Sequence, residues 1–407
     1  MFIIKGFILW NILHRFVLKI KKMGTKKAPL ELLLSEEKTK ELTKKLTDYY
    51  SDLETIQDYF LDRKKEKIIN LEHENYIGSF FDDYNMEPNE MDISVEVIPG
   101  KLFNPSAQLI ISLPLESQIG RQITLGVKEN KTGKWVGFIR LASPVLSIKP
   151  RNDIFVERLD AKQVNKHMYN GSIIVPVQPF GYNYLGGKLL ALICASHYSL
   201  DLWKEKYGDK VEPCFMETTS LYGDIKGVSQ YDGLKPFMRY GSMTESDLFL
   251  FPNESIYKEL RDYLRGIYGK EEWGGNLVDP KPSGPKMREF NKIISILKNH
   301  LKVFDFDSYE VFHKFTKEKM KAKTKKRFYY STFGYDNVVE HIKSNGDIEL
   351  RKRDNFDRFK LESVIEFWRK KAQRRHTKLK EEGRLRSDLE VYTSDTIDNY
   401  NKKDMVR

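Results

Sequence analysis

The sequence predicts a mixed α+β fold in which a mixed sheet carries one central buried helix and is flanked by N-terminal and C-terminal helical arms. Three observations predict it. Residues 30–76 place apolar side chains at helical spacing, short apolar runs typical of strands begin at Ala107, and residues 172–196 pass from a β-rich run through a Gly-rich turn into an apolar helix. The first predicted strands are antiparallel, and they are followed by one strand–helix–strand crossover, which joins parallel strands. A sheet that contains both kinds of pairing is a mixed sheet.

The N-terminal region, residues 1–76, is predicted to be a leader followed by an amphipathic helical arm. The apolar run of the first 22 residues is interrupted by Lys5, His14 and Arg15 and is too short to span a bilayer, so we expect no association with a membrane. Met23 resembles an alternative start. The leader is therefore either an upstream extension of the reading frame or an amphipathic surface helix.

The predicted core spans residues 77–270. Residues 77–106 are interrupted by prolines and are predicted to be a linker with one short strand. The hairpin composition of residues 129–133 joins two strands. The predicted strands are 107–113, 122–128, 134–143, 172–177, 211–218 and 237–243, and the predicted helices are 187–197 and 200–207.

The C-terminal part consists of a Gly and Pro-rich linker, residues 271–288, and a basic, mainly helical region, residues 289–407. Residues 314–386 hold 23 Lys or Arg against 11 Asp or Glu, whereas the whole chain has a net charge of +11. The rest of the chain is therefore close to neutral. A basic end on a neutral body indicates a polyanionic partner, most often nucleic acid, and the alternative is a solvated helical face.

The Gly-rich turn predicts an anion site. Glycines let the backbone approach a ligand closely, and the first free N–H groups of the helix from about Gly187 would point at a phosphate, assisted by the helix dipole. The alternative is a plain tight connection between strand and helix. The residues assigned to phosphate or cofactor binding are Val175, Val177, Gly186, Gly187, Lys188 and Leu189.

This order of elements resembles the Gcn5-related N-acetyltransferases, a family in which the loop between the fourth strand and its helix holds the pyrophosphate of acyl coenzyme A. The resemblance implies that acetyl coenzyme A or another acyl coenzyme A is the donor. It also implies that a tyrosine after the strand 211–218 serves the leaving thiolate, with Tyr222 and Tyr231 as candidates.

Acyl transfer also needs hydrogen-bond donors that stabilise the oxyanion and a base that accepts a proton from the acceptor. Pro176 and Pro179 interrupt regular pairing, so nearby backbone N–H groups are free for an oxyanion, or else the prolines only mark an edge strand. Asp153 and Glu157 are candidate bases, unless Arg151 holds them in a structural ion pair. Glu217, at the end of a strand, is either a second carboxylate in the cleft or a plain cap.

Ordered motifs over about residues 134–245 resemble the Druantia A family of phage-defence and transposon-associated proteins, and also phage-encoded DNA-modification proteins of the Mom type. The motifs are KWVGFI from Lys134, PRND from Pro150, LGGKLLAL from Leu185, WKEKYG from Trp203, and Glu217 with Thr218. The resemblance implies action on or near DNA, and the Mom type implies a transferase that acts on adenine.

Nucleic-acid contacts are predicted where clustered cations lie beside aromatic side chains. The candidates are Lys323, Lys325, Lys326, Arg327, Tyr329, Arg369, Lys370, Arg374 and Arg375. We expect DNA rather than RNA as the polymer. The sequence thus predicts a transferase that modifies nucleic acid, with two alternatives: a non-catalytic DNA-binding or assembly protein on the same fold, and a phage structural or host-interaction protein whose basic end binds RNA.

The cysteines and histidines predict no metal site. Cys194 lies in the predicted apolar helix and Cys214 in the next predicted strand, so both are interpreted as small core residues. The chain has no CxxC motif, and its eight histidines show no ligand spacing. Two isolated cysteines are typical of a reducing compartment, and we expect a cytoplasmic protein.

Overall fold

The computed structural model describes residues 32–115, 120–220, 229–269 and 285–399. By internal contacts the chain divides into two compact units, Met1–Lys45 with Lys258–Lys314, and Leu46–Tyr257 with Phe315–Arg407. The boundaries of these two units differ from those of the four predicted regions, because each unit combines an N-terminal and a C-terminal segment of the chain.

The smaller unit is helical. It contains the first part of α2 (Glu36–Ser51), most of α12 (Glu254–Tyr268) and α15 (Phe306–Glu318), and all of α14 (Pro285–Phe304). Leu42, Leu260 and Ile293 are buried on the inner faces of these helices. Their apolar positions recur at the spacing of one helix face, so packing in the unit follows from the helical period.

The larger unit is built on a seven-stranded mixed sheet in the order β1-β2-β3-β4-β5-β7-β6. Every neighbouring pair is antiparallel except β4 and β5, which are parallel. The strands are β1 (Ile93–Val97), β2 (Gln122–Glu129), β3 (Lys134–Ala142), β4 (Met168–Pro176), β5 (Phe215–Ser220), β6 (Arg239–Phe249) and β7 (Lys321–Ser331). The predicted mixed sheet is confirmed, as is the predicted β2–β3 hairpin.

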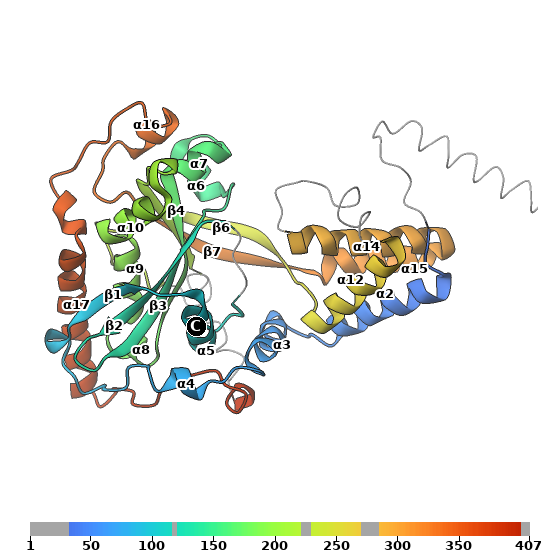
Figure 1. Cartoon of the computed structure of the whole chain (residues 1–407), viewed down its shortest axis with the longest axis horizontal. Helices are drawn as coiled ribbons and strands as arrows, with labels where there is room; N and C mark the ends of the chain where they lie inside the picture. The colour runs from blue at the N-terminus through green and yellow to red at the C-terminus, as the bar shows by residue number, and fades with distance from the viewer. Residues whose placement is uncertain (1–31, 116–119, 221–228, 270–284, 400–407) are drawn as a thin grey trace, which may run out of the picture. The chain divides into compact units, whose positions relative to one another are not determined.

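Helices cover both faces of this sheet (Figure 1). On one face, α9 (Gly186–Cys194) packs against β3 and β4, and α17 (Leu361–Glu381) packs on α9. The buried run Leu189–Ala195 and Trp368 share one apolar core with Val136 and Ile139 of β3. On the other face, α5 (Gly100–Ile110) packs through Phe103 and Ala107 against Trp135 and Phe138. The predicted central buried helix is confirmed, since eight of the nine residues of α9 are buried.

The remaining helices of this unit connect the strands or lie along its edges. They are α3 (Ile56–Ile68), α4 (Glu74–Ile77), α6 (Lys149–Phe155), α7 (Ala161–His167), α8 (Phe180–Asn183), α10 (His197–Tyr207) and α16 (Val338–Lys343), with short 3-10 helices η1 (Pro88–Glu90), η2 (Gly208–Lys210), η3 (Phe356–Phe359) and η4 (Ile397–Asn399). None of the helices in the described part of the chain is both long enough and apolar enough to cross a membrane.

One sequence prediction of secondary structure is wrong, and one region predicted as mainly helical also contains a strand. The apolar run 107–113, predicted as a strand, is the last turn of helix α5, which ends at Ile110, followed by three non-helical residues, because a short apolar run does not by itself distinguish a strand from a buried helix. The basic block beginning at Lys321 lies in the region predicted as mainly helical, 289–407, but is itself extended. It is strand β7, which lies in the sheet between β5 and β6.

Candidate functional site

The parallel strands β4 and β5 separate part-way along their length. They pair from Met168 with Phe215 to Asn170 with Glu217, and this pairing then ends. At the point of separation the Thr218 hydroxyl donates to the Gly171 carbonyl at 2.8 Å. Beyond it, β4 stays paired with β3 while β5 pairs with β7. The separation opens the sheet toward the C-terminal ends of the two strands.

A cavity of about 280 Å³ lies at this separation. Its wall combines apolar side chains with amides, hydroxyls, two tyrosines, one carboxylate and one lysine. The lining residues are Ile110, Ile111, Ser112 and Leu113, Ser172 to Pro176 of β4, Gln178, Thr219 and Ser220 of β5, Gln230, Tyr231, Lys326 of β7, Glu390 and Tyr392. An apolar wall with a few converging polar groups is the usual composition of a ligand site.

Lys326 is the cation of this cavity. It is half-buried, and burial lowers the pKa of its ammonium group. Its neighbours Lys325 and Arg327 pair with Glu245 and Asp232, but Lys326 forms no hydrogen bond or ion pair with any of the described residues. A partly buried charge without a counter-charge costs free energy, so this position favours an anionic ligand.

A polar network beside the cavity is centred on Asp232. Its carboxylate accepts hydrogen bonds from the Tyr329 hydroxyl at 2.6 Å, from Arg327 Nη1 at 3.0 Å and from the Ser229 amide at 2.9 Å. Burial opposes ionisation, but these bonds and the nearby Lys188 charge lower the pKa of Asp232 overall. The network fixes the loop that carries Tyr231, whose ring lies 5.4 Å from that of Tyr329.

The same loop fills the predicted phosphate cradle. Lys188 donates to the carbonyls of Gln230, at 3.1 Å, and Asp232, and a Cβ at Gly187 would collide with the Gln230 side chain. Gly186 packs against Phe180 and is buried. The two glycines therefore permit close packing at the mouth of α9, and the predicted pyrophosphate position is occupied by the protein itself.

Two further residues assigned to this cradle are also enclosed. Leu189 and Val177 are buried, and the Val177 amide donates to the Val136 carbonyl at 3.0 Å, so it is not free for an oxyanion. Val175 alone among the six lines the cavity.

The three carboxylates predicted to be catalytic, Asp153, Glu157 and Glu217, do not converge on one site. Arg151 Nη1 contacts both carboxylate oxygens of Glu217 at 3.0 Å, and both side chains are buried. Burial raises the pKa of Glu217 to about 7, and the Arg151 charge limits that rise. Asp153 pairs with Lys149 and Glu157 with Lys343 at the surface. Arg151 therefore does form a structural ion pair, but with Glu217 instead of Asp153 or Glu157.

Of the two candidate tyrosines, Tyr231 lines the cavity and is 4% exposed. Tyr222 lies outside the described residues.

The predicted nucleic-acid residues divide between β7 and α17. On β7, Tyr329 is 2% exposed and Arg327 is paired with Asp232, so neither is available for bases, whereas Lys323 and Lys325 are exposed. On α17, Arg369 pairs with Glu366 and Arg375 lies over the Tyr182 ring. Lys370 and Arg374 are exposed one turn apart on the outer face of α17.

The comparisons with known proteins identify the family. The model of the family described as Druantia protein DruA matches residues 43–272, more than half of the chain. The chain belongs to the DruA family. The predicted resemblance to Druantia A is thereby confirmed. The match includes β4, β5 and the loop that carries Tyr231, but it ends before Lys326 of β7.

A curated relative, Druantia protein DruA of Escherichia coli strain UMEA 4076-1, is 26% identical over 219 residues. The aligned part covers 50% of this DruA family chain and 54% of the relative, so the chain spans about half the length of the curated relative it matches. No solved structure matches the chain.

A second group of residues in this DruA family protein was not predicted from the sequence. His167, Cys214 and His341 are buried, and one nitrogen or sulfur atom of each lies within 4.8 Å of the others. Cys214 is indeed a core residue, but its sulfur also lies close to two imidazoles. The three residues come from distant segments, so no spacing motif could reveal them.

Proposed function

We propose that this protein contributes to antiphage defence by binding nucleic acid, with a backbone phosphate held by Lys326 in the cavity between β4 and β5. The observation that carries the proposal is the half-buried Lys326 ammonium group, which faces the cavity without a counter-ion among the described residues. A phosphate would supply the missing charge. The defence role follows from membership of the Druantia protein DruA family.

The polymer is inferred from charge. The excess of basic residues in 314–386 exceeds the net charge of the whole chain, and exposed cations lie on β7 and on α17. Neutralisation of phosphates by Lys and Arg releases counterions and drives non-specific binding. We infer that the polymer is DNA and not RNA, because the motifs that resemble the defence and Mom-type proteins imply action on or near DNA.

A second candidate function is chemical modification of a DNA base by an acetyltransferase-like transferase. The separation of β4 from β5 favours it, since a nucleobase in the cavity would meet Tyr231 and Lys326. Binding of acyl coenzyme A at the mouth of α9 would require Gln230 and Lys188 to leave their present contacts. For this reason nucleic-acid binding is the conclusion and transfer is the alternative.

The experiment compares Lys326→Ala with Lys325→Ala. These neighbours on β7 carry the same charge, but Lys325 is exposed and has Glu245 at 3.6 Å. Binding of labelled single-stranded and double-stranded DNA and RNA of one sequence is measured by fluorescence anisotropy over a range of salt concentrations. Loss of one phosphate contact should reduce the salt slope by about 1.

We expect Lys326→Ala to reduce affinity and slope more than Lys325→Ala, and Lys326→Arg to retain most of the binding. Equal binding by wild type and a folded Lys326→Ala variant would refute the proposed site. Mass spectrometry of nucleosides from cells that express wild type or Lys326→Ala then tests the alternative: an altered base found only with wild type supports transfer, and no altered base in either case leaves binding as the function.

A further inference from the structure

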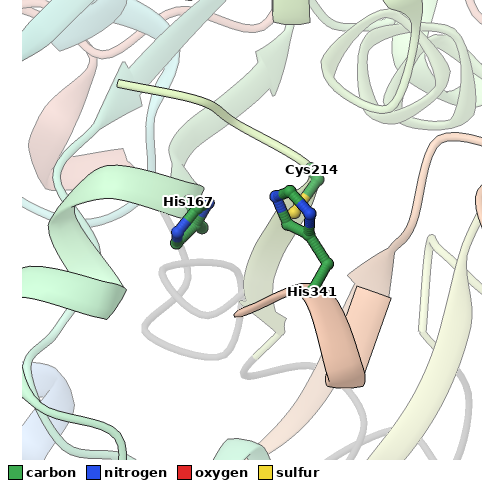
Figure 2. A group of neighbouring side chains, drawn as sticks. All are labelled: His167, Cys214 and His341. Carbon is green, nitrogen blue, oxygen red and sulfur yellow. The ribbon is translucent and has the colours of Figure 1, made fainter. Parts of the chain in front are cut away.

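The buried group of His167, Cys214 and His341 is assembled by the parallel strand pair. His167 ends α7 directly before β4, Cys214 directly precedes β5, and the Cys214 amide donates to the His167 carbonyl at 2.9 Å. His341 comes from α16, and its ring lies 5.0 Å from that of His167. Figure 2 shows the three side chains gathered at one place from these three segments.

Hydrogen bonds fix which nitrogen of each imidazole faces the group. His167 Nδ1 lies 3.1 Å from the Glu212 carbonyl, and His341 Nδ1 lies 2.6 Å from the Ile348 carbonyl. A carbonyl oxygen only accepts, so each Nδ1 must carry the proton, and the Nε2 of each neutral ring then holds a lone pair. Metal-binding histidines are typically held in this way by a second hydrogen bond.

Neither lone pair has a hydrogen-bond partner among the described residues. His167 Nε2 and His341 Nε2 are buried atoms without a hydrogen bond in the part of the chain that the structure describes. His167 is fully buried and His341 is 1% exposed. A buried polar atom left unsatisfied costs about 1–3 kcal/mol, so two of them at one place indicate a missing ligand.

We propose that His167 Nε2, His341 Nε2 and the Cys214 sulfur bind one Zn²⁺ ion, with the Glu212 carboxylate as the fourth ligand. One thiolate with two imidazoles is a donor set that suits Zn²⁺ in tetrahedral geometry. Glu212 Oε2 lies 3.9 Å from His341 Nε2, and Lys166 Nζ lies 3.3 Å from the same oxygen. On binding, the Cys214 thiol releases its proton to solvent and the sulfur forms the bond to zinc.

The site is structural. Zinc would lie at the N-terminal ends of β4 and β5, whereas the cavity begins at Ser172, five residues and roughly 16 Å further along β4. Helix α16 has only six residues, too few to be stable alone. The metal would attach α16 to the start of the parallel pair and so join segments that are distant in the sequence.

The experiment uses the full-length protein purified without chelators and measures zinc by mass spectrometry. We expect about one zinc per chain in wild type and loss of that zinc in Cys214→Ala and His341→Asn. Cys194→Ala and His300→Asn are matched controls, because Cys194 is a buried free cysteine of α9 and His300 is a buried histidine with both ring nitrogens hydrogen-bonded. Both controls should retain the metal.

A measurement on wild type alone guards against variants that fail to fold. After zinc is exchanged for Co²⁺, a thiolate-to-cobalt charge-transfer band together with the intense visible bands of tetrahedral Co²⁺ supports the site. Wild-type protein that contains no stoichiometric metal and shows no such band with Co²⁺ overturns the proposal. DNA binding by wild type is measured in parallel with and without the metal, so that a failure of the zinc site is distinguishable from a failure of the proposed function.

Discussion

Arg151 and Glu217 form a buried ion pair that joins α6 to β5 beside the point where β4 and β5 separate. One guanidinium nitrogen contacts both carboxylate oxygens at 3.0 Å, and another donates to the Val145 carbonyl at 2.7 Å. The Arg151 side chain is fully buried and that of Glu217 is 4% exposed. The pair therefore fixes α6 to β5 next to the point where the two parallel strands separate.

Replacement of Arg151 by Met should destabilise the protein by about 3–5 kcal/mol, because it leaves the Glu217 carboxylate buried without its partner. The double variant Arg151→Met with Glu217→Leu should cost much less, since neither charge then remains. Urea unfolding of the wild type, the two single variants and the double variant measures the coupling. Additive single effects would contradict the direct pairing of these residues.

Stability should fall as pH rises from about 4.5 to about 7. Burial raises the pKa of Glu217 to about 7 from its usual 4.5, so in this window the folded state keeps a proton that the unfolded state has lost. The free energy of unfolding therefore decreases with pH there and is unaffected by this group above the window. Urea titrations at several pH values test this, and Glu217→Gln should remove that part of the slope. An unchanged slope in Glu217→Gln would assign the dependence to other groups.

Much of the sheet could be predicted from the sequence because its signals are local. The turn 129–133 and its flanking apolar runs predict the β2–β3 hairpin, and the uniformly apolar run after Gly187 predicts the central helix. Strand β7 could not be predicted in this way. Alternate lysines from Lys321 face solvent, and only its end at Phe328–Tyr330 is apolar, so most of the strand has the composition of a solvated arm.

The candidate site was predicted only in part, since its parts meet through tertiary contacts. Val175, Tyr231 and Lys326 were assigned three separate roles from three segments, and the fold places them around one cavity. The glycines at the start of α9 predicted an anion cradle, but the loop at Gln230 fills it, and no local pattern shows where a distant loop will pack. The orphaned histidine nitrogens are visible only once the fold is known.

Gly137→Ala should destabilise the larger unit by about 1–3 kcal/mol through overpacking. A Cβ at this position of β3 would lie 2.7 Å from Leu190 of α9 and 2.9 Å from the Val175 carbonyl, and the backbone of β4 has no room to move away. Gly78→Ala is the control, because a Cβ there would meet no atom within 4 Å. Thermal unfolding compares the two. Equal melting temperatures would mean that α9 does not pack on β3 as described.

Loss of Trp368 should release α17 from the body. Its indole N–H donates to the Tyr184 carbonyl at 2.8 Å, and its ring is fully buried beside α9. Trp368→Ala should cost about 3–5 kcal/mol, and Trp368→Phe distinctly less because most of the apolar contact remains. Limited proteolysis within α17, read together with unfolding by urea, checks this. Cleavage of Trp368→Ala no faster than that of wild type would show that other contacts hold the helix.

The outer face of α17 should contribute phosphate contacts independently of the cavity. Lys370 and Arg374 are exposed four residues apart, so they lie on one line along the helix and can follow a polynucleotide backbone. The double alanine variant should weaken binding to DNA of any sequence and reduce the salt slope by about 2, since each lost phosphate contact removes about 0.9. Lys101→Ala with Lys162→Ala removes the same charge from other exposed positions and should leave the slope nearly unchanged. Equal slopes for the two double variants would mean that net charge, and not the face of α17, accounts for the binding.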